Sequence, residues 1–416
     1  MATSSGSQLK PSSRRNFTSA SVLVVHNRYQ RRGGENTVVN AELTLLRDHG
    51  NRLEYLEFSN DGLTERLNAI AKFGAAVGSV WSRDSAKRTR IASGRFRPDV
   101  IHVHNTFPTA SPSVYSAARS TGAAVVQTLH NYRLLCPNAL FFRDGHVCED
   151  CLGKFVPWPG VVHACYRDSR AATGVTAAML TVHRARKTLI IEVDLVIALT
   201  EFSRQKFIEG GLPDDRIVVK PNFIDRPYPP QRRDDDYFLF VGRLVDYKGA
   251  SLLPSAWRLI DDRPMLRIAG DGPQREEIAS VVIRFPQITL LGSIGAEEVQ
   301  YQMLGARALV VPSQLYETFG LIIIEAFASG LPVIASRLGA MAEIVDDGRT
   351  GLLFEPGNAA DLGAKVRWAA DHPHEMAQMG ANARAEYEAK YTAEINYAQL
   401  IAVYDQAIEI RKSRPS

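Results

Sequence analysis

The chain has 416 residues, of which 45% are hydrophobic and 23% are charged. This composition is typical of a soluble globular protein, and the length exceeds one ordinary hydrophobic core, so it predicts two or three domains. The longest apolar run, residues 321–336, is interrupted by Glu325 and Pro332. It falls short of the ~20 residues that a membrane-spanning helix needs.

The charge is unevenly distributed along the chain. The net charge is +4, but residues 1–222 contain 29 Lys and Arg against 19 Asp and Glu, and the remainder contains 20 against 26. A basic first half suits an acidic partner, either an anionic membrane surface or a phosphate-bearing acceptor. We do not expect nucleic acid as a partner. Ordinary solvated surface explains the same excess equally well.

Residues 1–20 are rich in Ser and Thr, contain Arg14 and Arg15, and lack the apolar core of a signal peptide. We expect a disordered leader and a cytoplasmic protein, with peripheral attachment to the inner face of the plasma membrane as a further option. In that compartment the four cysteines are not first candidates for disulfides.

Short apolar runs alternate with longer amphipathic stretches from residue 21 onward, which is the pattern of parallel α/β sheets. Most of the runs are apolar throughout, as in strands that are covered on both faces. The expected strands of the first half are 22–26, 53–58, 100–104, 124–129, 195–199 and 217–220, and those of the second half are 238–241, 266–269, 288–291, 308–311, 333–335 and 351–354.

Prolines and an acidic run indicate a linker over residues 223–237. We therefore predict two Rossmann-like domains that face one cleft, with ligands at the carboxyl ends of their strands. The N-terminal domain covers residues 21–222 and the C-terminal domain covers residues 238–396. Residues 397–416 contain a predicted C-terminal helix.

The loop after the first expected strand contains Gly33 and Gly34, directly before a helix. A glycine pair at a helix N-terminus suits a phosphate or a sugar ring that lies against the backbone. The loop is not a G-x-G-x-x-G fingerprint, which argues against a dinucleotide-dependent oxidoreductase.

Residues 63–97 mix apolar positions with a series of arginines and lysines. Such a segment can form an interfacial helix on an anionic membrane. We favour the alternative, a helix that faces the core and has a solvated basic end.

Three histidines fall at the ends of expected strands. His130 follows the run 124–129, and His102 and His104 lie at the end of the run 100–104. A histidine in such a position is usually only a polar terminus, so a structural role and a functional role both remain open for His102 and His104.

All four cysteines lie between residues 136 and 165, as Cys136, the pair Cys148 and Cys151, and Cys165. A Cys-x-x-Cys pair with two flanking cysteines can hold a tetrahedral structural Zn²⁺. The alternatives are unbonded thiols or a disulfide pair. We expect the zinc site, although the outer spacings fit no standard zinc ribbon.

Two loops of the second half follow expected strands and carry glycines. Gly242, Arg243 and Lys248 follow the run 238–241, and these two cations can neutralise a diphosphate, Arg by bidentate hydrogen bonds and Lys as a point charge. Gly270 and Gly272 follow the run 266–269 and permit close approach of a nucleotide, although the same residues occur in ordinary turns.

The segment from Glu317 to Glu325 is the most informative in the chain. Two carboxylates flank an apolar run, and Gly320 falls where a helix is expected to begin. A buried glutamate is costly unless a polar group meets it, and a helix N-terminus favours an anion such as phosphate. We therefore interpret the segment as a ligand site rather than as a purely structural helix.

With its flanking residues 312–313 and 326–336, this segment resembles the signature of the large family 4 of retaining glycosyltransferases, which have the two-domain GT-B fold. In that family a Glu, seven residues and a second Glu mark the nucleotide-sugar site. By position, the resemblance implies that Glu317 meets the sugar hydroxyls and that Glu325 meets the ribose. It also implies that the N–H groups of Phe319, Gly320 and Leu321 contact the sugar and the diphosphate.

The resemblance extends over nearly the whole chain past residue 20. It implies that the C-terminal helix within residues 397–416 crosses back onto the N-terminal domain, and it implies further donor contacts. These are Arg243 and Lys248 as stabilisers of the leaving group, the loop of Gly242 beside the diphosphate, the loop of Gly270 and Gly272 beside the nucleobase, Gly33 and Gly34 at the phosphate and acceptor, and His130 near the reacting carbon of the sugar.

The implied function is transfer of a sugar, with retention, from a UDP- or GDP-sugar to a lipid-linked or saccharide acceptor in polysaccharide or glycolipid biosynthesis. No cofactor is expected for catalysis. The alternatives are a nucleotide-sugar epimerase, a sugar phosphorylase of similar build, and a non-catalytic protein that binds nucleotide-sugar.

Overall fold

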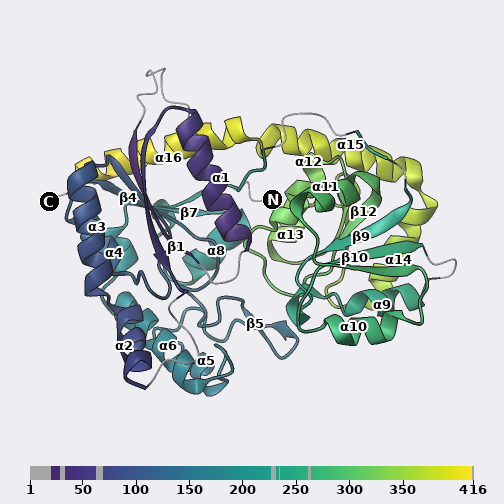
Figure 1. The fold of residues 1–416 in the computed structure, drawn as a ribbon, viewed down its shortest axis with the longest axis horizontal. Coiled ribbons are helices and arrows are strands. Elements are labelled where there is room, and N and C mark those ends of the chain that lie inside the picture. Colours follow the sequence, from purple (N-terminus) through teal and green to yellow (C-terminus); the bar gives the residue numbers. More distant parts are fainter. Residues whose placement is uncertain are drawn as a thin grey trace, which may run out of the picture.

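The structure is a computed structural model of the chain, and it describes residues 20–28, 33–61, 69–225, 231–233, 235–260 and 264–414. The expected leader, residues 1–20, lies outside this part except for Ala20. Two α/β halves lie side by side, and the last two helices run along both of them (Figure 1).

The elements of the first half are, in chain order, β1 (Ser21–Arg28), α1 (Gly34–Asp48), β2 (Arg52–Ser59), α2 (Ala69–Val80), α3 (Arg83–Phe96), β3 (Val100–Asn105), α4 (Ser113–Arg119), β4 (Ala124–Thr128), β5 (Phe142–Arg143), β6 (His146–Val147), α5 (Trp158–Val162), α6 (Arg170–Ala185), α7 (Thr188–Glu192), β7 (Leu195–Ala198), α8 (Glu201–Glu209), the 3₁₀ helix η1 (Asp214–Arg216) and β8 (Ile217–Val219).

The elements of the second half are β9 (Tyr237–Val241), the 3₁₀ helix η2 (Asp246–Lys248), α9 (Leu252–Arg258), β10 (Met265–Ala269), α10 (Arg275–Val282), β11 (Ile288–Gly292), α11 (Ala296–Gly305), β12 (Ala306–Val311), α12 (Leu321–Ala328), β13 (Val333–Ser336), α13 (Gly339–Ile344), β14 (Gly351–Phe354), α14 (Ala359–Asp371), α15 (Pro373–Lys390) and α16 (Ala393–Ser413).

Each half is built on a six-stranded sheet whose paired strands run parallel. The order is β2-β1-β3-β4-β7-β8 in the first sheet and β11-β10-β9-β12-β13-β14 in the second. The prediction of an α/β fold with parallel sheets is confirmed, and each of the twelve expected strands is present.

The strands are apolar because both of their faces are covered. In β1, Leu23 and Val25 belong to one hydrophobic cluster of the first half while Val22 and Val24 belong to another, and all four are at most 1% exposed. Alternate residues of a strand point to opposite faces, so the two clusters lie on opposite sides of the sheet.

The strand β2 forms one edge of the first sheet and is only partly buried. Two arginines of α3 contact this strand: Arg95 pairs with Glu54, and Arg88 lies over the ring of Phe58 at 4.3 Å. Charged side chains protect an edge strand from pairing with other chains. The described part of the segment 63–97 therefore forms two helices, and α3 packs on the sheet.

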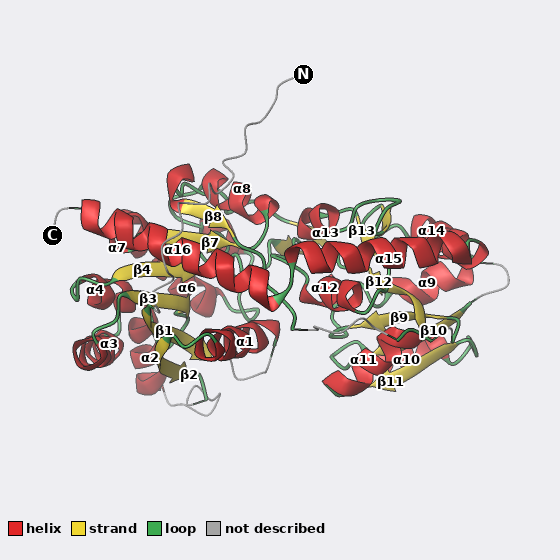
Figure 2. Ribbon diagram, turned by 90° about the horizontal axis from the view of Figure 1, so that it is seen from above, coloured by secondary structure: helices red, strands yellow, loops and turns green. Residues whose placement is uncertain are grey.

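The final helix, α16, returns to the first half. Leu400, Val403 and Tyr404 are at most 1% exposed and pack in one cluster with Val22 and Val126 of the first sheet. Figure 2 shows α15 along the second half and α16 along the first. The helix begins at Ala393, four residues before the expected start at residue 397. No helix among the described residues is both long and apolar enough to cross a bilayer.

Candidate functional site

Each sheet has a switch point, where successive strands begin to be added on the opposite side of the first strand. In the second sheet, β10 and β11 lie on one side of β9 and β12 lies on the other, so the loops after β9 and β12 leave the sheet as neighbours. In the first sheet the same relationship holds for β1 and β3. Ligands of open α/β sheets bind at such points.

Backbone hydrogen bonds join three loops at the carboxyl ends of β9, β10 and β12. Leu244 N–H donates to Asp271 O at 3.0 Å, and Gln314 N–H donates to Tyr247 O at 2.8 Å. The loops that carry the predicted donor contacts of the second half therefore form one continuous surface.

An ion pair lies where two of these loops meet. Lys248 Nζ is 2.5 Å from Glu317 Oε1, and Ser313 Oγ donates to the same oxygen at 3.0 Å. The side chain of Lys248 is 30% exposed and that of Glu317 is 15% exposed. Both side chains are thus oriented and remain accessible to a ligand.

The helix α12 begins beside this pair. Its first residue follows Gly320, whose φ of 84° lies in the left-handed region that glycine adopts readily. Phe319 is only 3% exposed, whereas Leu321 and Glu325 are half-buried. Glu325 is therefore at the margin of the apolar helix face, with Ile323 and its neighbours on the buried side, rather than enclosed in the core.

The glycines after β9 and β10 are required by close backbone packing. A Cβ atom on Gly270 would lie 1.8 Å from the carbonyl oxygen of Gly242, and one on Gly272 would lie 2.4 Å from that of Leu244. Arg243, on the same loop, is exposed, and its Nη1 donates to the hydroxyl of Tyr247 at 3.3 Å. Its recorded hydrogen bond therefore ties it to its own loop and not to Glu317.

In the first half, His130 follows β4 and contacts another histidine. His130 Nε2 lies 2.9 Å from His104 Nδ1, and the two rings stack with centroids 5.2 Å apart. Burial lowers the pKa of His104 to about 4 and that of His130 well below its usual value. Both imidazoles are therefore neutral at physiological pH.

The Gly33–Gly34 loop lies at the start of α1, beside a buried carboxyl group. Burial raises the pKa of Glu35 to about 8, against opposing hydrogen bonds from Asn105 and Asn131. A Cβ atom on Gly33 would meet nothing within 4 Å, whereas one on Gly34 would lie 3.9 Å from Leu321 of the second half.

Hydrogen bonds connect the two halves at this place. Thr318 Oγ1 donates to the carbonyl oxygen of His130 at 2.9 Å, and Tyr132 OH donates to that of Glu317 at 3.4 Å. Thr200 Oγ1 in turn donates to the carbonyl oxygen of Thr318 at 3.2 Å. The backbone next to His130 is thus held against the loop that carries Glu317.

The four cysteines lie together beside this site. Cys136, Cys148, Cys151 and Cys165 all line one small cavity of about 10 Å³, and none forms a disulfide. Burial raises the pKa of Cys151 to about 11. Among the described residues, the group of three ligand atoms that all lie within 4.8 Å of one another belongs to Glu42, His102 and His104, so no three of the four sulfur atoms are that close together.

Two family models match most of the chain. The model "Glycosyl transferase 4-like domain" matches residues 19–222, and "Glycosyl transferases group 1" matches residues 223–386.

The chain belongs to the group 1 glycosyltransferases.

The matches between this chain and its curated relatives cover only part of either protein. It is 41% identical over 256 residues to D-inositol 3-phosphate glycosyltransferase 2 of Catenulispora acidiphila, a match that covers 52% of this chain and 57% of that protein. It is 32% identical over 206 residues to an uncharacterized glycosyltransferase of Methanocaldococcus jannaschii, covering 48% of this chain and 58% of that protein. The chain therefore spans less than two thirds of the length of these relatives.

Solved glycosyltransferase structures share the fold. One from Rickettsia africae superposes with a TM-score of 0.68 at 15% identity, over 95% of this chain and 100% of that chain. The Anabaena protein HepE in complex with UDP-glucose superposes with a TM-score of 0.60 at 17% identity, over 91% of this chain and 98% of that chain. The predicted GT-B architecture is confirmed.

Several residues of the candidate site were not singled out by sequence analysis. Glu35, Tyr132 and Thr318 lie at or beside the contact between the halves, and Glu42 contacts His104. Glu35 directly follows a glycine pair, so its position at a helix start was a usable signal. Glu42 lies inside α1 and offered no such signal.

Proposed function

We propose that this glycosyltransferase transfers a sugar, with retention, from a nucleotide-diphosphate sugar to a lipid-linked or saccharide acceptor. The proposal is carried by the Lys248–Glu317 ion pair at the switch point of the second sheet, next to the loop that bonds His130 of the first domain. A cation for the diphosphate and a carboxylate for the sugar hydroxyls are thus available within one site.

The chemistry follows from where charge develops. As the bond between the sugar and the diphosphate breaks, negative charge accumulates on the leaving group, and fixed positive groups lower the barrier. Lys248, Arg243 and the N–H groups from Phe319 to Leu321 would provide this stabilisation. We assign no cofactor to this step and no covalent nucleophile.

The other site residues would bind the donor. Glu325, half-buried at the margin of α12, would accept from the ribose hydroxyls, and the close-packed loop of Gly242, Gly270 and Gly272 would lie along the nucleotide. His130 would contact the sugar near its reacting carbon, and the Gly33–Gly34 loop would meet the phosphate and the acceptor. We favour UDP because HepE, which shares the fold, binds UDP-glucose, and GDP is the alternative.

We place the acceptor on the first domain, and propose a peripheral contact with an anionic membrane. The outward side of α3 exposes Arg83, Lys87 and Arg90 together with Ile91, which is 60% exposed. Lysine and arginine near an anionic surface contribute ~1 kcal/mol each. Sedimentation with anionic and with neutral vesicles tests this contact, and equal binding to both would contradict it.

We also propose that the cysteines hold one structural Zn²⁺. All four line one cavity, although a tetrahedral site would draw their sulfur atoms closer together than they lie in this structure. The surrounding segment has little regular structure to stabilise it: six described non-glycine residues with positive φ lie between residues 139 and 168. Phe141 and Phe142 of the same segment contact Tyr316 and Tyr247 of the second domain. The metal would therefore support the contact between the domains.

The decisive test of the function is a donor panel with Glu317 variants. Thermal shift with UDP-, GDP- and ADP-sugars identifies the donor, and turnover is then measured with and without acceptor. We expect Glu317→Gln to bind the nucleotide but to lose on the order of 100-fold in turnover, and Glu317→Ala to lose transfer while keeping the fold. Near-normal turnover in these variants would refute the site assignment.

The same assay separates the alternatives. An epimerase changes the sugar without an acceptor, a phosphorylase requires phosphate, and a binding protein is stabilised by the donor but shows no turnover. NMR of the product anomer distinguishes retention from inversion.

A further inference from the structure

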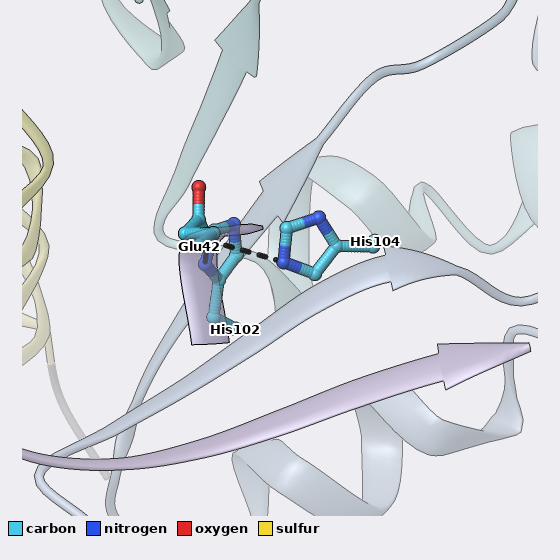
Figure 3. A group of neighbouring side chains, drawn as sticks. All are labelled: Glu42, His102 and His104. Atoms are coloured by element: carbon cyan, nitrogen blue, oxygen red, sulfur yellow. Dashed lines mark ion pairs between the residues drawn. The ribbon is translucent and has the colours of Figure 1, made fainter. Parts of the chain in front are cut away.

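A buried ionic cluster lies beneath the switch point of the first sheet, and the proposed function does not use it directly. It consists of Glu42 from α1, His102 and His104 from β3, and Lys220, which follows β8. Each of these residues is at most 3% exposed. Figure 3 shows Glu42 beside the rings of His102 and His104.

Glu42 is the centre of the cluster. Its Oε1 atom lies 3.0 Å from His102 Nδ1 and 3.2 Å from His104 Nε2, and its Oε2 atom lies 3.5 Å from Lys220 Nζ. A buried charge is costly unless an opposite charge balances it. Burial alone would raise the pKa of Glu42, but the groups around its carboxylate, with the Lys220 ammonium among them, hold this pKa well below its usual value. Glu42 is therefore a carboxylate, and Lys220 provides its counter-charge.

The cluster reaches the site through His104. The contact between His104 Nε2 and Glu42 Oε1 is at ion-pair distance but is not aligned as a hydrogen bond, so the carboxylate acts on the ring mainly by its charge. A proton on Nε2, next to the anion, is the favoured tautomer. His104 Nδ1 then has the lone pair, and it accepts the hydrogen bond of 2.9 Å from His130 Nε2–H.

We propose that Glu42 and His104 are positioning residues that fix the orientation and tautomer of His130, so that His130 is protonated on Nε2 and presents Nδ1 as a hydrogen-bond acceptor. The role of His130 toward the donor sugar rests on the proposed function. The tautomer itself does not, because it follows from contacts within the first domain.

A metal site is the competing interpretation, since the ligand atoms of Glu42, His102 and His104 lie within 4.8 Å of one another. Two observations oppose it. The Lys220 ammonium already lies beside the Glu42 carboxylate and would repel a second cation. Both ring nitrogens of His102 also have other partners, Tyr404 OH at 2.9 Å and Thr128 Oγ1 at 2.8 Å.

The first experiment measures the tautomer in the full chain. The protein contains 10 histidines, so selective ¹⁵N-histidine labelling gives a tractable long-range ¹H–¹⁵N spectrum, and the signals lost in His130→Gln assign His130. We expect a neutral ring protonated on Nε2 at neutral pH. A ring protonated on Nδ1, or a cationic ring, would overturn the proposal whatever reaction the enzyme catalyses.

The second experiment asks whether Glu42 acts through His130. Glu42→Gln removes the charge and keeps the shape, and we expect kcat to fall on the order of tenfold with little change in donor KM. In the His130→Ala background the same substitution should cost no further activity. An equal loss in both backgrounds would mean a general structural role and would refute the proposal.

Controls separate the remaining outcomes. Glu192→Gln is the control, because Glu192 is another hydrogen-bonded glutamate of the first domain, half-buried where Glu42 is fully buried, and accepts from Ser116 Oγ at 2.6 Å without contacting His130. The turnover of this variant should be unchanged. If the wild type contains one bound metal ion per chain and Glu42→Gln loses it, the cluster is a metal site, and the proposed positioning role of Glu42 and His104 is refuted. If the wild-type protein transfers no sugar from any donor, the proposed function fails. The ¹⁵N spectrum still tests whether His130 has the predicted tautomer. The same spectrum of the wild type tests the tautomer if Glu42→Gln does not fold.

Discussion

Lys248 Nζ lies 2.5 Å from Glu317 Oε1, although the two residues are 69 positions apart and belong to loops that follow different strands. The pair is partly exposed, so an incoming anion could replace Glu317 as the partner of Lys248. Glu317 would then be available to accept hydrogen bonds from hydroxyl groups. An ion pair that opens on binding keeps both side chains oriented before the ligand arrives. In the proposed function, the pair would be preorganised for a ligand with a negative and a polyhydroxyl part.

Removal of the lysine charge should weaken binding of the nucleotide. We expect Lys248→Met to raise the Kd for UDP, or for GDP if that nucleotide binds the wild type, by about tenfold to a hundredfold, because a charge-assisted contact with the diphosphate is lost. Isothermal titration calorimetry measures this. Lys412→Met, at the exposed end of α16, is the control, and an equal Kd in both variants would contradict the assignment.

The role of Glu325 predicts a different kinetic change. We expect Glu325→Gln to raise donor KM by about tenfold with kcat nearly unchanged, because a ribose contact is the same in ground and transition states. The wild type should also prefer UDP over its deoxyribose analogue, and the variant should lose this preference. Glu388→Gln, on the exposed side of α15, is the matched control. A drop in kcat without a change in KM would argue against ribose binding.

Substitution by alanine should have different effects on stability at two glycines of the site. At Gly270 the backbone φ is 154° and a Cβ atom would lie 1.8 Å from the Gly242 carbonyl oxygen, so Gly270→Ala should destabilise the protein by on the order of 2–4 kcal/mol. At Gly33 the φ is −148° and the space around Cβ is open, so Gly33→Ala should melt at the wild-type temperature. Calorimetry compares them, and similar melting temperatures would contradict the packing at Gly270.

The zinc proposal predicts about one metal ion per chain. Purified protein should contain close to one Zn per molecule by plasma mass spectrometry, and Cys148→Ser with Cys151→Ser should lose the metal and melt at a lower temperature, because a structural zinc contributes directly to folding. No metal in the wild type, together with four thiols that react freely in the folded protein, would refute the site.

The buried histidines predict that stability falls as the pH decreases from 6.5 toward 4. Burial lowers the pKa of His104 to about 4, so within this window the unfolded chain binds a proton that the folded chain does not, a contribution of up to about 1.4 kcal/mol per pH unit. Glu35, with its pKa raised to about 8, opposes this, because in this window the folded chain already holds a proton on Glu35 that the unfolded chain binds only near the ordinary pKa of a carboxyl group.

The measurement is urea unfolding of the wild type and of His104→Gln at several pH values between about 5 and about 7, the range in which an ordinary histidine titrates. The variant should show a shallower dependence of the unfolding free energy on pH. An identical slope in both proteins would show that His104 is not the group responsible.

The fold was readily predicted from the sequence because its strands are covered on both faces. Runs such as residues 22–25 of β1 and 237–241 of β9 are continuously apolar or aromatic, and such a run between amphipathic stretches is a local signal. The residues of the second half that carry charge beside glycines, Lys248 and Glu317, were predictable for the same reason: both follow strand ends, where chemistry concentrates in parallel sheets.

The cluster around Glu42 could not be predicted in this way. Within α1 the residue has Ala41 and Leu43 as neighbours and looks like a solvated helix position. It is buried because Lys220 and the C-terminal helix, both far away in the sequence, cover it. The contact of Thr318 with His130 likewise depends on how the two domains sit against each other, which no local pattern encodes.

The return of α16 to the first domain has a consequence for biosynthesis. Leu400 and Tyr404 complete a hydrophobic cluster whose other members include Val22 and Val126. On the ribosome, the half that is translated first must wait for the residues of α16 to emerge before its interior is closed. The half that is translated later can finish folding sooner. This is the reverse of the usual order, in which the N-terminal domain folds first during synthesis.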